Sequence, residues 1–218
     1  QVAYDMGIDR LSAWMTRFGY GEYSGIDLME EYNGVMPTRE WKLRRYKKQW
    51  YQGDTIPVGI GQGYWTSTPI QMSKALNTLI NDGVVKTPHL LLGTKEGGGM
   101  LPYEQKEYIA IGDIHSGYWE LAKSGMFGVA NAPNGTGRKF FAGTRYKAAA
   151  KSGTAQVFSY ETYNASKLAE RLRDHKLMIA YAPYDNPKVA VTIILENGGA
   201  GPAVGTLVRQ ILDHVLLG

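Results

Sequence analysis

Cysteine is absent from the 218 residues, and this absence excludes several chemistries at once. Without a thiol the chain has no disulfide framework, no cysteine-ligated zinc site and no cysteine nucleophile. Long apolar runs are also absent, because the longest, 178–183 and 189–195, fall well short of the ~18 residues that span a membrane. The 24 Lys and Arg exceed the 20 Asp and Glu by only 4. That excess is too small for a dedicated nucleic-acid binder, so no nucleic-acid partner is expected.

Several catalytic and cofactor-binding motifs are missing too. The four histidines, at 89, 115, 175 and 214, show no His-x-x-x-His spacing, so no metal site is expected. Gly-x-Ser-x-Gly does not occur. A Ser/His/Asp triad stays open, because its members need not be close in sequence. The run Gly59-x-Gly61-x-Gly63 lacks the spacing of a dinucleotide loop and the ending of a P-loop, so it predicts a tight turn.

The remaining sequence has the pattern of a globular α+β chain. Apolar spacing predicts helices ending near Gly19, starting at Thr68-Pro69, covering 113–124 and starting at Pro202. Short apolar runs predict strands over 89–92, 147–158, 178–182 and 189–195, the last two joined as a hairpin. Residues 161–173 are expected to be helical or irregular. Three antiparallel strands followed by an amphipathic helix predict a sheet covered by helices. Because the first helix has no N-cap, we expect a fragment of a longer protein.

A basic run occupies residues 39–48, with Trp41 and Tyr46 inside it. Charge runs are usually the solvated face of a helix, and that interpretation is favoured here. An interaction surface for nucleic acid, another anionic polymer or membrane headgroups is the second interpretation.

The stretch Lys147-Ala-Ala-Ala-Lys151-Ser152-Gly153-Thr154-Ala155 is the most informative part of the chain. Alanines and Gly153 leave a strand almost without bulk, and such a strand lets another extended backbone approach closely. Lys151 adds a positive charge, and Ser152 and Thr154 add hydroxyls. The pattern therefore predicts a groove for an extended peptide that ends in a carboxylate.

This stretch resembles the Lys-Thr/Ser-Gly box of the serine acyltransferases that include penicillin-binding proteins and β-lactamases. Further stretches resemble class B penicillin-binding proteins, and within them the penicillin-binding protein 2 subfamily of elongation transpeptidases from Gram-negative rods. They are 56–63, 68–72, 112–120, 195–199 and 200–206. The resemblance implies a penicillin-binding/β-lactamase-like transpeptidase fold with its N-terminal portion missing. It also implies that residues 1–218 form the C-terminal part of one transpeptidase domain.

The resemblance further implies roles for residues of the box. Lys151 would match the box lysine, and the Thr154 backbone N–H would supply half of an oxyanion hole, so these two are the candidate catalytic residues. Ser152, Gly153, Thr154 and Ala155 would line the site for the substrate. No metal and no organic cofactor is implied. The expected partners are peptidoglycan stem peptides, β-lactams, and the membrane-embedded glycan polymerase and shape-determining proteins of the elongation machinery. The expected location is a periplasmic domain of a protein anchored in the inner membrane.

The chain departs from the family in two of its three sequence boxes. None of the nine serines is followed by Lys three places on, or by Asn or Asp two places on. The nucleophile, its lysine and the second box are therefore expected upstream, and this chain alone is predicted to be inactive. Two alternatives remain: a non-catalytic peptidoglycan- or protein-binding module of the same fold, and, ranked lower, a β-lactamase.

Overall fold

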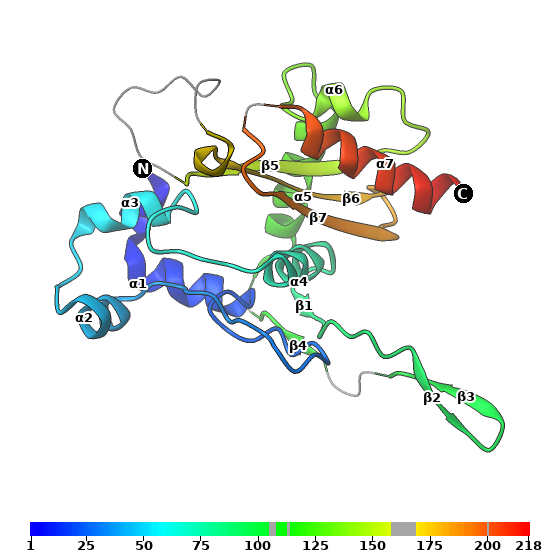
Figure 1. The fold of residues 1–218 in the computed structure, drawn as a ribbon, viewed down its shortest axis with the longest axis horizontal. Coiled ribbons are helices and arrows are strands. Elements are labelled where there is room, and N and C mark those ends of the chain that lie inside the picture. The colour runs from blue at the N-terminus through cyan, green and yellow to red at the C-terminus, as the bar shows by residue number, and fades with distance from the viewer. Residues whose placement is uncertain (105–107, 113, 158–168, 200) are drawn as a thin grey trace. The chain divides into compact units, whose positions relative to one another are not determined.

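The computed structural model describes residues 1–104, 108–112, 114–157, 169–199 and 201–218. They form two compact units, residues 1–113 (unit 1) and 114–218 (unit 2), which are described separately (Figure 1). Unit 1 contains α1 (Val2–Arg17), α2 (Arg39–Tyr46), η1 (Gln52–Asp54), α3 (Thr55–Val58), α4 (Pro69–Ile80), β1 (Val84–Val85), β2 (Gly93–Glu96), β3 (Gly99–Pro102) and β4 (Ile109–Ala110). Unit 2 contains α5 (Ser116–Asn131), α6 (Arg138–Phe141), β5 (Ala149–Ala155), η3 (Glu170–Leu172), β6 (His175–Ala182), β7 (Val189–Leu195) and α7 (Ala203–Leu217).

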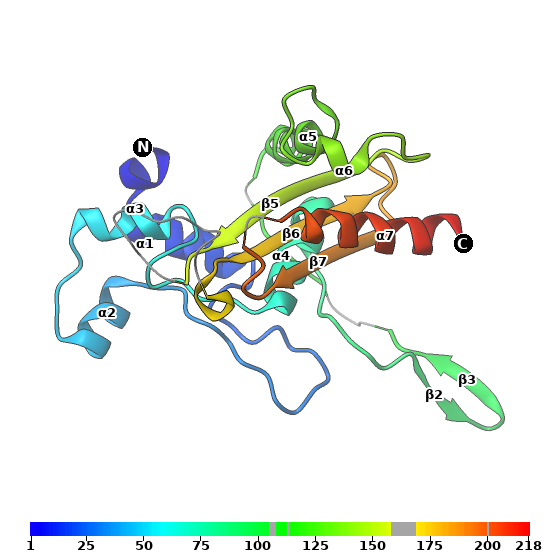
Figure 2. The ribbon, with the colours of Figure 1, turned by 45° about the horizontal axis from the view of Figure 1, so that its top comes forward.

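Unit 2 is built on an antiparallel sheet in the order β5-β6-β7. Helix α7 runs alongside β6 and β7, and α5 packs against β5 (Figure 2). Where the helix meets the sheet, Val208 and Leu212 bury completely against strand alanines such as Ala150 and Ala180. This burial of apolar surface is the main force that holds the helix on the sheet. The predicted α+β arrangement of three strands and a final helix is confirmed.

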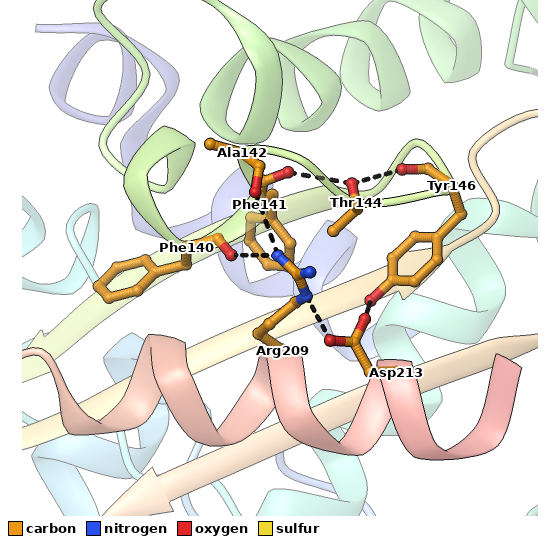
Figure 3. Close-up of polar contacts among 7 residues, drawn as sticks. All are labelled: Phe140, Phe141, Ala142, Thr144, Tyr146, Arg209 and Asp213. Carbon is orange, nitrogen blue, oxygen red and sulfur yellow. Dashed lines mark hydrogen bonds and ion pairs between the residues drawn. The ribbon is translucent and has the colours of Figure 1, made fainter. Parts of the chain in front are cut away.

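A polar cluster ties α7 to the segment that leads into β5 (Figure 3). Arg209 donates to Asp213 and to the carbonyls of Phe140 and Ala142, and the Tyr146 hydroxyl donates to Asp213 at 2.8 Å. Burial alone would raise the pKa of Asp213, but the hydrogen bonds from Tyr146 and Arg209 lower it below its ordinary value. Burial, followed by the hydrogen bond to Asp213, raises the pKa of Tyr146.

Unit 1 depends on buried polar side chains. Helix α4 begins with a capping box in which Thr68 and Gln71 exchange hydrogen bonds. The fully buried Gln71 amide also donates to the carbonyls of Glu22 and Asn33, each at 2.7 Å. One side chain therefore connects the start of α4 with the loop between α1 and α2.

The basic run forms α2, and the favoured interpretation of a solvated face holds for most of it but is wrong for Lys42. Lys42 is only 3% exposed and bonds Asp54 at 2.5 Å. Its ammonium also lies 5.2 to 5.7 Å from the ring centres of Trp50, Tyr51 and Tyr64. A buried ammonium needs a carboxylate or aromatic faces around it, and here it has both.

The strand predicted over 89–92 is wrong, because β2 begins at Gly93. The Asp27 carboxylate accepts the backbone N–H groups of Leu90 and Leu91, each at 2.7 Å, so these donors are not available to a strand partner. The Gly97-Gly98 turn then joins β2 to β3, with φ of 57° and 88° at the two glycines.

Other predicted elements are present in the structure and differ from the prediction mainly in where they begin and end. The predicted helix over 113–124 is α5, which extends to Asn131. The predicted strand over 147–158 is shorter in the structure, where β5 ends at Ala155 and residue 158 lies outside the described residues. In the prediction for 161–173, residues 161–168 lie outside the described residues and 170–172 form η3.

Candidate functional site

The predicted site residues 151–155 all lie on β5, an edge strand of the sheet in unit 2. Within the described part of the chain no strand pairs with the outer side of β5. Ala148, Ala149 and Ala150 are fully buried, whereas Lys151 and Thr154 are exposed. The start of the strand is thus fixed in the core, and its second half presents polar groups at an open edge, the arrangement that binds extended peptides.

Side chains along β5 alternate between the two faces of the sheet. Ser152 lies opposite Met178, and Thr154 lies opposite Lys176. These hydroxyls therefore continue the face that Ala148 and Ala150 bury in the core with α7. Lys151, Gly153 and Ala155 lie on the other face. The structure brings the five predicted residues onto one strand but divides them between its faces.

The Lys151 ammonium donates to the Ser152 carbonyl at 2.6 Å. Backbone groups of residues two apart on an antiparallel strand point to the same edge. The Thr154 N–H therefore points the same way as the Ser152 carbonyl that Lys151 contacts. The Lys151 ammonium and the Thr154 N–H donor therefore lie at the same edge of β5.

Two further polar side chains join the hydroxyls. Thr136 Oγ1 lies 3.4 Å from Ser152 Oγ, and the Lys176 ammonium donates to Thr154 Oγ1 at 3.0 Å. Sequence reasoning missed both residues. Thr136 precedes α6, and Lys176 follows a long connection after β5 with no turn signal to fix the pairing. Only the observed register places Lys176 opposite Thr154.

Gly153 is explained in part by packing inside the sheet. A Cβ at this position would come within 2.7 Å of Leu177 Cδ1 on the neighbouring strand. Because that atom is the end of a flexible side chain, Leu177 can move aside for a methyl group. A branched side chain would need more room on the face that Lys151 shares.

A buried phenol lies on the same face as Lys151, near the start of β5. Tyr181 is opposite Ala149 and fully buried. Burial is the largest cause of the raised pKa of Tyr181. This phenol is neutral at ordinary pH and adds no charge beside the lysine.

In the described residues no three His, Cys, Asp or Glu side chains come together in a way that could hold a metal ion. No helix among those residues is both long and apolar enough to cross a membrane.

Comparison with known proteins gives a consistent result. Residues 1–213 match the family model described as "Penicillin binding protein transpeptidase domain". The chain is 73% identical, over its whole length, to "Peptidoglycan D,D-transpeptidase MrdA" of Escherichia coli K12 and covers 35% of that protein. It therefore spans about a third of the length of these curated relatives, which include the MrdA proteins of Salmonella typhimurium and Haemophilus influenzae.

Two solved structures are also similar to this chain. The PBP2 of Pseudomonas aeruginosa in complex with WCK 5153 superposes with a TM-score of 0.83 at 37% identity, covering 99% of this chain and 46% of the other. The PBP2 of Helicobacter pylori in complex with MreC gives a TM-score of 0.83 at 27% identity, covering 100% and 38%. These matches confirm the fold and the resemblance predicted from the sequence.

Proposed function

The chain belongs to the family of penicillin-binding protein transpeptidase domains, and on this premise we propose that it contributes one wall of a peptidoglycan D,D-transpeptidase site. Residues 1–218 would be the C-terminal part of a single transpeptidase domain. The observation that supports this most directly is the open edge of β5, with Lys151, Ser152 and Thr154 in its polar half and Gly153 between them.

The proposed reaction is acyl transfer through a serine that lies outside this chain. The serine oxygen attacks the carbonyl carbon of the penultimate D-Ala of a stem peptide. Its proton passes to the departing amine, and terminal D-Ala leaves as the acyl-enzyme forms. An amine of a second stem peptide then attacks the acyl carbon, loses a proton and displaces the serine. The product is a cross-link, and the free serine is restored.

The residues of β5 would serve this reaction in distinct ways. The Thr154 N–H donates to the oxyanion that develops in the transition state. Lys151 supplies positive charge at the same edge. Ser152 and Thr154 hold the carboxylate of the substrate or of a β-lactam with their hydroxyls. Gly153 and Ala155 keep the strand narrow, so that an extended peptide can lie against it.

The parent protein would act during cell elongation as a periplasmic domain anchored in the inner membrane. Its ligands would be stem peptides and β-lactams. Its protein partners would be a membrane-embedded glycan polymerase and shape-determining proteins, and the complex of the Helicobacter relative with MreC supports a partner of the second kind.

Intact mass spectrometry with benzylpenicillin tests the proposal. The 24.1 kDa chain should gain no adduct, because it contains no Ser-x-x-Lys. A longer protein that carries this segment together with the first two family boxes should gain one penicillin. If that longer protein is folded and gains none, the chain is part of a non-catalytic binding module.

A substitution at Gly153 tests the role of the strand. Gly153→Val in the longer protein should abolish acylation while the circular dichroism spectrum stays native. The control is Gly125→Val on α5, where an added Cβ meets no atom within 4 Å. Acylation of Gly153→Val at the wild-type rate would contradict the assignment of β5 as the binding strand.

A further inference from the structure

Lys176 is a second cation beside the candidate site, and the proposed function gives it no role. It is the second residue of β6, directly opposite Thr154, and its ammonium donates to Thr154 Oγ1 at 3.0 Å. Among the described residues no Asp or Glu oxygen lies within 4.0 Å of this ammonium. Within the described part of the chain, the charge of Lys176 therefore contacts a neutral hydroxyl and no carboxylate.

The donors around Lys176 lie on one face of the sheet. Ser152 and Thr154 present their hydroxyls there, Thr136 approaches Ser152, and Lys176 adds an ammonium. Lys151 belongs to the opposite face. An anion at the edge of β5 would thus have Lys151 on one side, and Lys176 with the hydroxyls on the other. Three hydroxyls and one ammonium are the kind of donor set that binds a carboxylate.

We propose that Lys176 is a specificity-determining residue that binds the terminal carboxylate of the stem peptide, or of a β-lactam, together with Ser152 and Thr154. This inference rests on the proposed function. In the absence of ligand the ammonium holds the Thr154 hydroxyl on the carboxylate-binding face. When the carboxylate arrives, it accepts bonds from the hydroxyls and from Lys176.

The role of Lys176 differs from that of Lys151. Lys176 is one strand further from the open edge, and its contact is the hydroxyl of Thr154. Its charge should therefore strengthen initial binding more than it accelerates bond formation. A neutral side chain at 176 should weaken the recognition of ligands that carry the carboxylate, and of no others.

The experiment compares benzylpenicillin with its methyl ester, in a protein that carries this segment and the first two family boxes. Stopped-flow acylation separates the binding constant from the acylation rate constant. Lys176→Gln should lower the second-order rate constant for benzylpenicillin about three- to tenfold, mainly through weaker binding. The rate for the ester should not change, and Lys176→Arg should keep most of the wild-type rate.

The matched control is Lys188→Gln. Lys188 is exposed whereas Lys176 is half-buried, and Lys188 lies just before β7, at the opposite end of the sheet from Lys176. The Lys188→Gln substitution removes the same charge and should leave the rates for benzylpenicillin and for its ester unchanged. This control separates a local contact of Lys176 from the effect of the protein's net charge.

Three results would overturn the inference. An unchanged rate for benzylpenicillin in Lys176→Gln would show that the ammonium does not bind the carboxylate. An equal loss with the ester would show a structural role, through the position of Thr154. If the wild-type protein gains no adduct from either compound, the proposed function fails, and the inference fails with it.

Discussion

The two units bury different kinds of side chain. The interior of unit 2 is mostly small and apolar, with Ala148, Ala150 and Ala180 beneath Val208 and Leu212. In unit 1 a small apolar cluster around Ile8 and Val58 shares the interior with Gln71 and Lys42. Apolar packing tolerates many substitutions of similar volume, whereas a buried polar group requires particular partners. Unit 1 should therefore be more sensitive to the loss of one partner, and unit 2 to the loss of volume.

The largest expected effect is in unit 1. Lys42→Met should lower the free energy of unfolding by about 4 kcal/mol, because Asp54 would keep a partly buried charge without its partner. The double variant Lys42→Met, Asp54→Leu should recover most of that loss, since an apolar pair of similar volume avoids the desolvation cost. Native-state hydrogen exchange of amides in α2 measures the local free energy of opening.

The control for Lys42 is Arg44→Met on the same helix. Arg44 is exposed, so its loss should cost less than about 0.5 kcal/mol. If the double variant is as unstable as the single one, the aromatic rings around Lys42 contribute more than its ion pair. The stability that Lys42 gives to unit 1 would then come mainly from the contacts of its ammonium with the aromatic rings.

The corresponding loss in unit 2 is one of volume. Leu212→Ala should cost about 3 kcal/mol, because Leu212 is fully buried and its removal leaves a cavity between α7 and the sheet. Leu217→Ala near the end of the same helix is the control, since Leu217 is 46% exposed. Hydrogen exchange of β6 amides measures both. A cost below about 1 kcal/mol for Leu212→Ala would mean that the small-residue core collapses around the cavity.

The difference between the units also explains what the sequence could predict. The strands and final helix of unit 2 follow from apolar period and run length, because a core of this kind is encoded locally. Residues 151–155 could be named as a site for the same reason, since their small size stands out. In unit 1 the basic run predicted a solvated helix, and nothing in its spacing singles out Lys42 for burial.

Partners distant in sequence could not be predicted. Asp27 occupies the amides of Leu90 and Leu91 across more than sixty positions, which is why no strand forms there. Lys176 reaches Thr154 only through the register of β5 and β6. Side-chain contacts of this kind depend on the finished fold, and they supply most of the polar detail in both units.

The smallest expected effect concerns the polar cluster of Tyr146, Arg209 and Asp213 in unit 2. It tests whether charge also stabilises the unit whose interior is mostly apolar. Asp213→Asn keeps the shape of the side chain and removes its charge, so the contacts with Arg209 and Tyr146 become weaker. The cost should be about 1 kcal/mol near neutral pH, as for a single partly exposed charged hydrogen bond. Urea unfolding followed by hydrogen exchange in α7 measures it, with Asp185→Asn on the exposed β6–β7 turn as the control.

The pH dependence of this effect has a definite sign. The folded protein lowers the pKa of Asp213, so the charged form contributes stability above the unfolded value of about 3.9. That contribution is lost as the pH falls through the folded pKa, and wild type and Asp213→Asn should converge in acid. A difference that persists unchanged below both pKa values would mean that the cost comes from the acceptor oxygen that the amide lacks, and not from the charge. The charge of Asp213 would then contribute nothing to the stability of α7 in unit 2, whereas the buried Lys42–Asp54 ion pair is expected to stabilise unit 1.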